Sequence, residues 1–221
     1  MRYTVLVSRE KRLVRLFGSD YSVYVRIARL CLAEKNVSYT LVPVDVFASE
    51  GVPRDYLQRH PFARIPAFEH GSFRLYETGA IARYVDEAFE GPDLQPHDPA
   101  ARARCNQLIS IADGYAYRHM VWGVYVERVS KPEDGAETDE AKLAASIAQS
   151  QIVLTALCDV MEEGPWMLGD QLTLADIYWA PMVDCFRQAP EGAKLMAAFP
   201  KLQSWWQRMA ARPSVIGTRP T

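Results

Sequence analysis

Short apolar runs and helical spacings alternate along the first ninety residues. Leu13–Phe17 is apolar except for Arg15 and ends at Gly18, which predicts a strand followed by a turn. Apolar residues from Val23 to Cys31 then recur at helical spacing and predict a helix. Tyr39–Val46 predicts a second strand, and Pro43 places it at a sheet edge because proline cannot donate to a strand ladder.

A hairpin and a further helix complete this part of the chain. Ala67–Glu69 and Phe73–Tyr76 flank the sequence His70-Gly71-Ser72, which is typical of a hairpin turn. Apolar residues from Ile81 to Phe89 form a helical stripe. With a short helix before the hairpin, the order strand, helix, strand, helix, strand, strand, helix predicts a small mixed sheet with helices on its faces.

The second half of the chain has a helical pattern throughout. Residues 91–97 are rich in proline and glycine and predict a linker, and Ala100–Val129 and Ala141–Glu163 predict long helices. A last helix is expected from Pro200 to Ala211 because proline fits the first helical turn. We therefore expect an α/β domain over 13–90 and an all-α domain over 98–221, with 1–12 as an N-terminal extension.

Thr173-Leu174-Ala175-Asp176 is the sharpest local signal in the helical half. Thr173 can cap the first amides of a helix, and Asp176 can accept a hydrogen bond from the amide of Thr173. Such a capping box contributes about 1 kcal/mol and predicts where a buried helix begins.

Composition and charge limit the classes of partner that the protein is expected to bind. An apolar fraction of 49% is ordinary for a globular protein, and 25 Lys and Arg against 27 Asp and Glu leave no basic excess for nucleic acid. No apolar run approaches the ~18 residues that span a bilayer, and charges within 1–12 interrupt any signal peptide. We expect a cytoplasmic protein that binds neither nucleic acid nor membrane.

Several cofactor and catalytic motifs are missing from the sequence. The four cysteines contain no Cys-x-x-Cys pair, and there is no Gly-x-Gly-x-x-Gly loop, no Walker-type loop, no Gly-x-Ser-x-Gly elbow and no His-Glu-x-x-His helix. We therefore expect no metal.

Three stretches together resemble the cytosolic glutathione transferases of the serine type, in a bacterial or plant class like phi, theta or zeta. They are Gly18–Ser22, His60–Phe68 with the following Leu75–Thr78, and Thr173–Ile177 with Phe199–Leu202. The resemblance implies a thioredoxin-like domain followed by an all-α domain, with glutathione as co-substrate and a hydrophobic electrophile. It also implies detoxification as the role and a homodimer, in which Phe47 or Phe62 would be the apolar anchor.

The resemblance makes Ser22 the catalytic residue. A glutathione thiol near its reference pKa of ~8.5 is only a few per cent thiolate at neutral pH. A hydroxyl that donates to the sulfur at a helix N-terminus stabilises the thiolate through a hydrogen bond and the helix dipole. Ser19 and Tyr21 are competing hydroxyls, and an ordinary N-cap role is the alternative for Ser22.

Four further residues are implied to bind glutathione. Pro66 matches the family's cis-proline, which frees the backbone of Ile65 to pair with the cysteinyl part of glutathione. Glu77 would hold the γ-glutamyl ammonium and Thr78 the γ-glutamyl carboxylate. A helix cap with an acidic residue describes Glu77 and Thr78 equally well.

Two departures from the family pattern concern this site. The glycine usual after His60-Pro61-Phe62 is Ala63, so the turn must avoid positive φ or accept strain. Basic residues for the glycine carboxylate are missing at Gly51 and Val52, so that Arg54 or Arg64 would have to bind it.

Aromatic residues crowd one helix of the second domain. Tyr115, His119 and Trp122 share a face by spacing, and the resemblance implies that they line an electrophile pocket between the domains, together with Tyr21. A helix-bundle core is the alternative for this face.

The function expected is that of an enzyme, a glutathione transferase. A glutathione-dependent isomerase, dehalogenase or etherase of the same fold, or a non-catalytic binding or regulatory protein, is the alternative. The joint presence of Ser22, Pro66 and Glu77-Thr78 favours the enzyme, because a binding protein would not need all of them.

Overall fold

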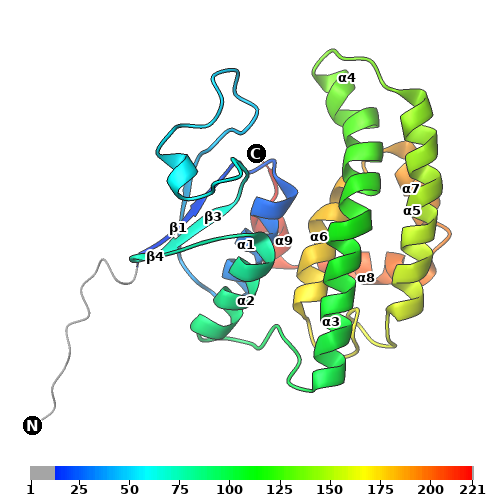
Figure 1. Ribbon diagram of the computed structural model, residues 1–221. Coiled ribbons are helices and arrows are strands. Elements are labelled where there is room, and N and C mark those ends of the chain that lie inside the picture. Colours follow the sequence, from blue (N-terminus) through cyan, green and yellow to red (C-terminus); the bar gives the residue numbers. More distant parts are fainter. Residues whose placement is uncertain (1–12, 221) are drawn as a thin grey trace, which may run out of the picture. The chain divides into compact units, whose positions relative to one another are not determined.

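The computed structural model describes residues 13–220, which fall into two compact units (Figure 1). One unit comprises the described residues up to Pro92 together with 218–220, and the other spans Asp93–Gly217. The expected N-terminal extension, 1–12, lies outside the described residues.

The first unit contains a four-stranded mixed sheet. Its strands are β1 (Val14–Phe17), β2 (Thr40–Val42), β3 (Ala67–His70) and β4 (Phe73–Tyr76), in the order β2-β1-β3-β4. β1 pairs parallel with β2 and antiparallel with β3, and β3 and β4 form the predicted hairpin. The predicted edge position of β2 is confirmed, and the strand ends before Pro43, which has no N–H to donate.

Two helices cover one face of this sheet. α1 (Val23–Glu34) and α2 (Thr78–Ala88) lie side by side there (Figure 1). The core of the unit includes side chains with no exposed surface from both strands and helices: Leu16, Phe68, Ile27 and Ile81. A single turn of 3₁₀ helix, η2 (Tyr56–Gln58), is the short helix expected between β2 and the hairpin.

The second unit is all helical, as predicted. Its long helices are α3 (Pro99–Ile111), η3 (Ala112–Ser130), α5 (Glu140–Val160) and α6 (Leu174–Phe186), and α6 is buried along nearly its whole length. The shorter helices are α4 (Lys131–Glu133), α7 (Pro190–Met196), α8 (Pro200–Ala210) and α9 (Pro213–Gly217). The predicted start of α8 at Pro200 is confirmed.

The predicted long helix from Ala100 is α-helical only as far as Ile111. It continues as the π-helix η3, at whose end the amide of Lys131 donates to the carbonyl of Val126, five residues earlier. Gly123 of η3 lies so close to α5 that a Cβ there would stand 2.1 Å from Oγ of Ser146. Apolar spacing does not carry this tertiary constraint, so it could not separate an α-helix from a π-helix.

α5 corrects the expectation that no segment is long and apolar enough to span a membrane. Its 21 residues include an 18-residue window of mean hydropathy 1.4, which is enough by length and composition alone. Polar residues such as Ser146, Gln149 and Thr155 interrupt its apolar residues, so no unbroken apolar run was visible in the sequence. In the second unit α5 packs along η3, with 33% of that window buried (Figure 1).

The predicted capping box is confirmed at the start of α6, and its aspartate also binds groups outside the helix. Oδ2 of the buried Asp176 accepts from the amide of Thr173 at 2.8 Å. Oδ1 accepts from the amide of Met167 and from Nε1 of Trp205, each at 2.8 Å. The box therefore ties the start of α6 to α8 and to the preceding loop.

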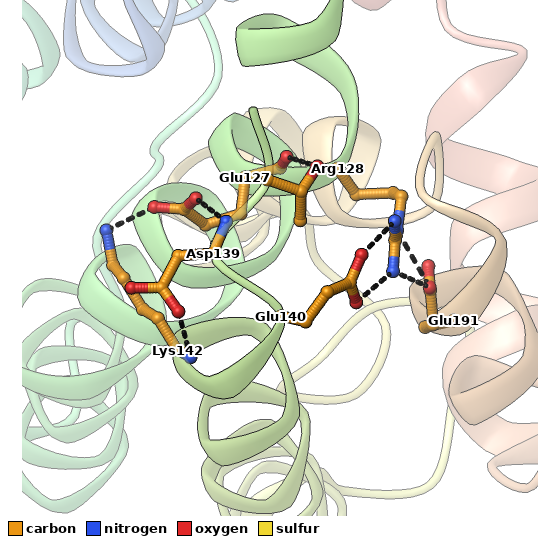
Figure 2. Close-up of polar contacts among 7 residues, drawn as sticks. Glu127, Arg128, Asp139, Glu140, Lys142 and Glu191 are labelled. Carbon is orange, nitrogen blue, oxygen red and sulfur yellow. Dashed lines mark hydrogen bonds and ion pairs between the residues drawn. The ribbon is translucent and has the colours of Figure 1, made fainter. Parts of the chain in front are cut away.

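A buried carboxylate fastens η3 to the start of α5 (Figure 2). Glu127 has no exposed surface and accepts from Nζ of Lys131 and of Lys142 at 2.6 Å each, and from the amide of Asp139 at 3.1 Å. Burial alone would raise the pKa of Glu127, but the hydrogen bonds from both lysines lower it to about 2.

The neighbouring Arg128 extends this network to α7. Its guanidinium donates to both carboxylate oxygens of Glu140, at 2.9 and 2.8 Å, and to Oε1 of Glu191 at 2.8 Å (Figure 2). Together, Glu127 and Arg128 of η3 make contacts with residues of α4, α5 and α7.

Candidate active site

The turn between β1 and α1 brings together the hydroxyls of Ser19, Tyr21 and Ser22. Ser19 Oγ donates to the carbonyl of Val44 at 2.7 Å, and the Tyr21 hydroxyl donates to Oδ1 of Asp45 at 3.0 Å. Ser22 Oγ accepts from the amide of Val25 at 3.3 Å. Within residues 13–220, the Ser22 hydroxyl alone of the three has no protein acceptor for its proton.

Ser22 is the N-cap of α1, as the sequence predicts. Its backbone is extended and its side chain is half-buried at the positive end of the helix dipole. Because the hydroxyl proton is uncommitted, it can donate to an anion placed at this helix end. The site can therefore stabilise a thiolate.

Gly18 allows this turn to approach the loop before β3. A Cβ at Gly18 would stand 2.4 Å from Cγ2 of Val25 and 3.2 Å from Cβ of Ile65. Only glycine fits this approach without displacing its neighbours. The turn that carries Ser22 and the segment that carries Ile65 and Pro66 are thus neighbours.

The peptide bond between Ile65 and Pro66 is cis, as the resemblance implies. Ile65 precedes β3 and lies outside its ladder, so its backbone is not engaged in the sheet. Ala63 takes a φ of +52°, which settles the question that the missing glycine raised: the turn accepts a conformation that favours glycine. Tyr56 donates from its hydroxyl to the carbonyl of Arg64 at 2.6 Å and holds the same loop.

Glu77 and Thr78 form the junction between β4 and α2. Glu77 is the N-cap of α2 with φ +70° and ψ +117°, a conformation that costs a non-glycine residue about 1–3 kcal/mol and recurs at ligand-binding positions. Its side chain is exposed and makes no capping hydrogen bond, whereas Thr78 is buried. The carboxylate of Glu77 is thus available to a ligand, and helix capping does not explain why a carboxylate stands at this position.

Arg54 and Arg64 lie in the connection between β2 and β3, and both side chains are exposed. Arg64 directly precedes Ile65, whereas Arg54 precedes η2. Neither arginine forms an ion pair with another residue of the described part of the chain, 13–220. Both remain candidates for the glycine carboxylate.

The aromatic face predicted on the long helix lies on η3. Tyr115 is 60% exposed, Trp122 is 38% exposed and His119 is half-buried, so the bundle core does not account for them. The buried side of η3 is formed instead by Ala112, Ala116, Met120, Val121, Gly123, Val124 and Glu127. Tyr21, the fourth residue predicted for the electrophile, is an exposed residue of the first unit.

His60 is a residue whose side chain the sequence did not single out. It is buried, and its ring centroid lies 4.9 Å from that of Tyr76, the residue before Glu77. Its place in the His60-Pro61-Phe62 motif was the available signal. Over residues 13–220, no group of three or more His, Cys, Asp or Glu side chains could hold a metal ion.

Comparisons with known proteins cover both units of the chain. Residues 16–93 match the family model of the glutathione S-transferase N-terminal domain, and residues 109–213 match that of the C-terminal domain. Glutathione S-transferase F13 of Arabidopsis thaliana is 29% identical over 94% of this chain and 95% of its own length. Glutathione S-transferase 4 of Zea mays is also 29% identical, over 91% of this chain and 89% of its own length.

Solved structures give the same result. The apo structure of glutathione S-transferase III matches with a TM-score of 0.82 and 29% identity, over 93% of this chain and 95% of that one. Glutathione transferase F2 of Populus trichocarpa matches with a TM-score of 0.83 and 26% identity, over 93% and 96% of the two chains. Since the two family models together span most of the chain and both domains have the matching fold, the protein belongs to the glutathione S-transferase family.

Proposed function

We propose that this glutathione S-transferase forms the thiolate of glutathione at Ser22 and transfers it to a hydrophobic electrophile. The observation that carries the proposal is the Ser22 hydroxyl, which caps α1 and has no acceptor for its proton among residues 13–220. Lowering the thiol pKa by about two units requires roughly 2.7 kcal/mol. One charged hydrogen bond and the helix dipole are together of that size.

The rest of the peptide binds away from the sulfur. The backbone of Ile65 beside cis-Pro66 pairs with the cysteinyl residue, and Arg64 or Arg54 binds the glycine carboxylate. Glu77 holds the γ-glutamyl ammonium, and Thr78 holds the γ-glutamyl carboxylate at the start of α2. The strained backbone and free carboxylate of Glu77 support this assignment.

The electrophile binds to aromatic side chains. We assign Tyr115, His119 and Trp122 of η3 to it, and Tyr21 of the first unit. Their exposure supports the assignment, because a transiently bound apolar substrate needs accessible aromatic surface. The enzyme would act in the cytoplasm as a homodimer that detoxifies such compounds.

Substitution of Ser22 tests the proposal. We expect Ser22→Ala to lower turnover by about ten- to a thousand-fold, the range for losing one anion-stabilising donor. The KM for glutathione should stay within a few-fold, because the ends of the peptide are bound elsewhere. Ser19→Ala is the matched control, since the Ser19 hydroxyl is committed to the carbonyl of Val44. Tyr21→Phe removes the other competing hydroxyl, which donates to Asp45.

Kinetics with a panel of aromatic halides, hydroperoxides and aryl ethers would measure these effects and identify the electrophile. If Ser22→Ala kept full turnover while Tyr21→Phe lost it, the assignment of the thiolate to the Ser22 hydroxyl would be wrong. Failure of the wild-type protein to bind immobilised glutathione would contradict the function itself.

A further inference from the structure

The side chain of His60 occupies the space between the two segments assigned to glutathione. It is 3% exposed, and its ring centroid lies 4.9 Å from that of Tyr76 and 6.2 Å from that of Phe62. Tyr76 directly precedes Glu77, and Phe62 lies in the loop that leads to Pro66. The imidazole therefore packs against both sides of the proposed peptide site.

The backbone of His60 is fixed at both ends. Its amide donates to the carbonyl of Tyr56 at 3.0 Å, and its carbonyl accepts from the amide of Ala63 at 3.0 Å. Its ring nitrogen Nδ1 is nevertheless buried without a hydrogen-bond partner among residues 13–220. Nearly all buried polar atoms are paired, so an unpaired one points to a role other than holding the fold.

Charges from both sides of the site act on this ring. Burial has the largest effect and lowers the pKa of His60; the carboxylate of Glu77 raises it, and the guanidinium of Arg64 lowers it. The nearby hydroxyl of Tyr56 donates to the carbonyl of Arg64 and carries no charge at neutral pH. The ring is therefore neutral at pH 7.

We propose that His60 is a positioning residue of the glutathione site whose protonation weakens glutathione binding. The inference rests on the proposed function, in which Glu77 holds the γ-glutamyl ammonium. A proton on His60 creates a second cation near the same carboxylate and makes a buried ring charged, which favours its displacement from between Phe62 and Tyr76. If Arg64 rather than Arg54 binds the glycine carboxylate, that carboxylate acts in the opposite direction, but Glu77 has a larger influence on the ring than Arg64.

The thermodynamic coupling between protonation of His60 and glutathione binding determines how affinity changes with pH. If protonation weakens binding, binding must in turn lower the pKa of His60. The dissociation constant then rises as pH falls through the pKa of His60 in the free protein.

Calorimetric titration with S-methylglutathione between pH 5.5 and 8.0 tests this, because the blocked thiol cannot itself titrate. For the wild-type protein we expect the dissociation constant to rise about fivefold from pH 7.5 to 5.5. His60→Asn, which is polar but does not titrate, should bind within about threefold of wild type at pH 7.5 and lose this pH dependence. His70→Asn is the matched control and should keep it, since the ring of His70 is engaged with the hydroxyl of Tyr84.

A wild-type profile that is flat, or a His60→Asn profile equal to that of wild type, would overturn the inference while leaving the proposed function intact. Absence of binding at every pH would refute the proposed function and the inference together. NMR of histidine-labelled wild type gives a test that does not depend on the folding of His60→Asn. The His60 signal is the one that persists in single variants of His70, His97 and His119, and its pKa must fall when S-methylglutathione binds. An unchanged or raised pKa would overturn the inference.

Discussion

Substitution of Glu77 can distinguish a role in ligand binding from a role in helix capping. Its carboxylate makes no capping hydrogen bond, and its backbone stands at φ +70°. We expect Glu77→Gln to leave the γ-glutamyl ammonium unpaired at a cost of about 2–3 kcal/mol, which is roughly a thirty- to hundred-fold loss of glutathione affinity. Because this contact is equal in the ground and transition states, the KM for glutathione should rise far more than kcat falls.

Steady-state kinetics and thermal unfolding of the same variant measure both alternatives. Glu87→Gln, at an exposed position near the other end of α2, is the control and should change neither the KM nor kcat. A lowered melting temperature with an unchanged KM would assign Glu77 to the helix end and remove it from the site.

Ala63 carries a conformational cost that glycine would remove. Its φ of +52° places Cβ against the neighbouring backbone, which costs an L-residue about 1–2 kcal/mol. We expect Ala63→Gly to raise the free energy of unfolding by about 1 kcal/mol and Tm by roughly 2–4 °C. Ala145→Gly, at an exposed position inside α5, should have the opposite sign by about 1 kcal/mol. If thermal unfolding showed the same decrease of Tm in both variants, this explanation would be refuted.

At this scale the sequence indicated which residues form the candidate site but not how they are bonded. Ser22, Pro66 and Glu77 could be placed because each stands in a motif of fixed spacing. The choice among the hydroxyls of Ser19, Tyr21 and Ser22 depended on acceptors in Val44 and Asp45, which lie more than twenty residues away. Such contacts leave no trace in local pattern.

At the scale of elements, the network around Glu127 makes the second unit sensitive to acid. The pKa of Glu127 is about 2 in the folded protein, below the ordinary value of 4.5. A depressed carboxyl pKa contributes stability that is complete above the unfolded value and is lost as pH falls toward the folded one. We therefore expect Tm to fall between pH 4.5 and pH 2, as thermal unfolding at a series of pH values would measure.

Substitution isolates the contribution of this carboxylate. Glu127→Gln should lower stability at pH 7 by about 2 kcal/mol, because Lys131 and Lys142 lose a charged partner, and it should flatten the acid-dependent fall. Glu137→Gln, at an exposed position in the adjoining loop, is the control and should retain the wild-type profile. An unchanged slope in Glu127→Gln would place the acid-sensitive group elsewhere.

Elements were predictable where local pattern decides them and unpredictable where packing does. The capping box at Thr173 and Asp176 and the first turn at Pro200 fixed the starts of α6 and α8, and Pro43 fixed the edge strand. The π-helical form of η3 was not predicted. It occurs where Gly123 closely approaches Ser146, and such a contact between distant residues cannot be seen in the local sequence.

At the scale of the whole molecule, the two-domain architecture followed from the change of period along the chain, whereas the proposal of a homodimer depends on exposed apolar residues. Phe47 and Phe62 are 66% and 67% exposed on the first unit, as an apolar anchor for a second subunit must be before assembly. Buried aromatic anchors contribute at least about 2 kcal/mol to such interfaces.

We therefore expect light scattering to give twice the 25.0 kDa of one chain. Substitution of the anchor, in Phe47→Ser or Phe62→Ser, should raise the dimer dissociation constant by about thirtyfold, as sedimentation at a series of concentrations would measure. Ile216→Ser, at an apolar position on α9 that is 53% exposed, is the control and should leave assembly unchanged. Because Phe62 also packs edge-on against Tyr76, at 6.2 Å between ring centroids, thermal unfolding of the variant must show that the monomer retains its fold. A mass of one chain at micromolar concentration, or an unchanged dissociation constant in both phenylalanine variants, would contradict this assignment of the interface.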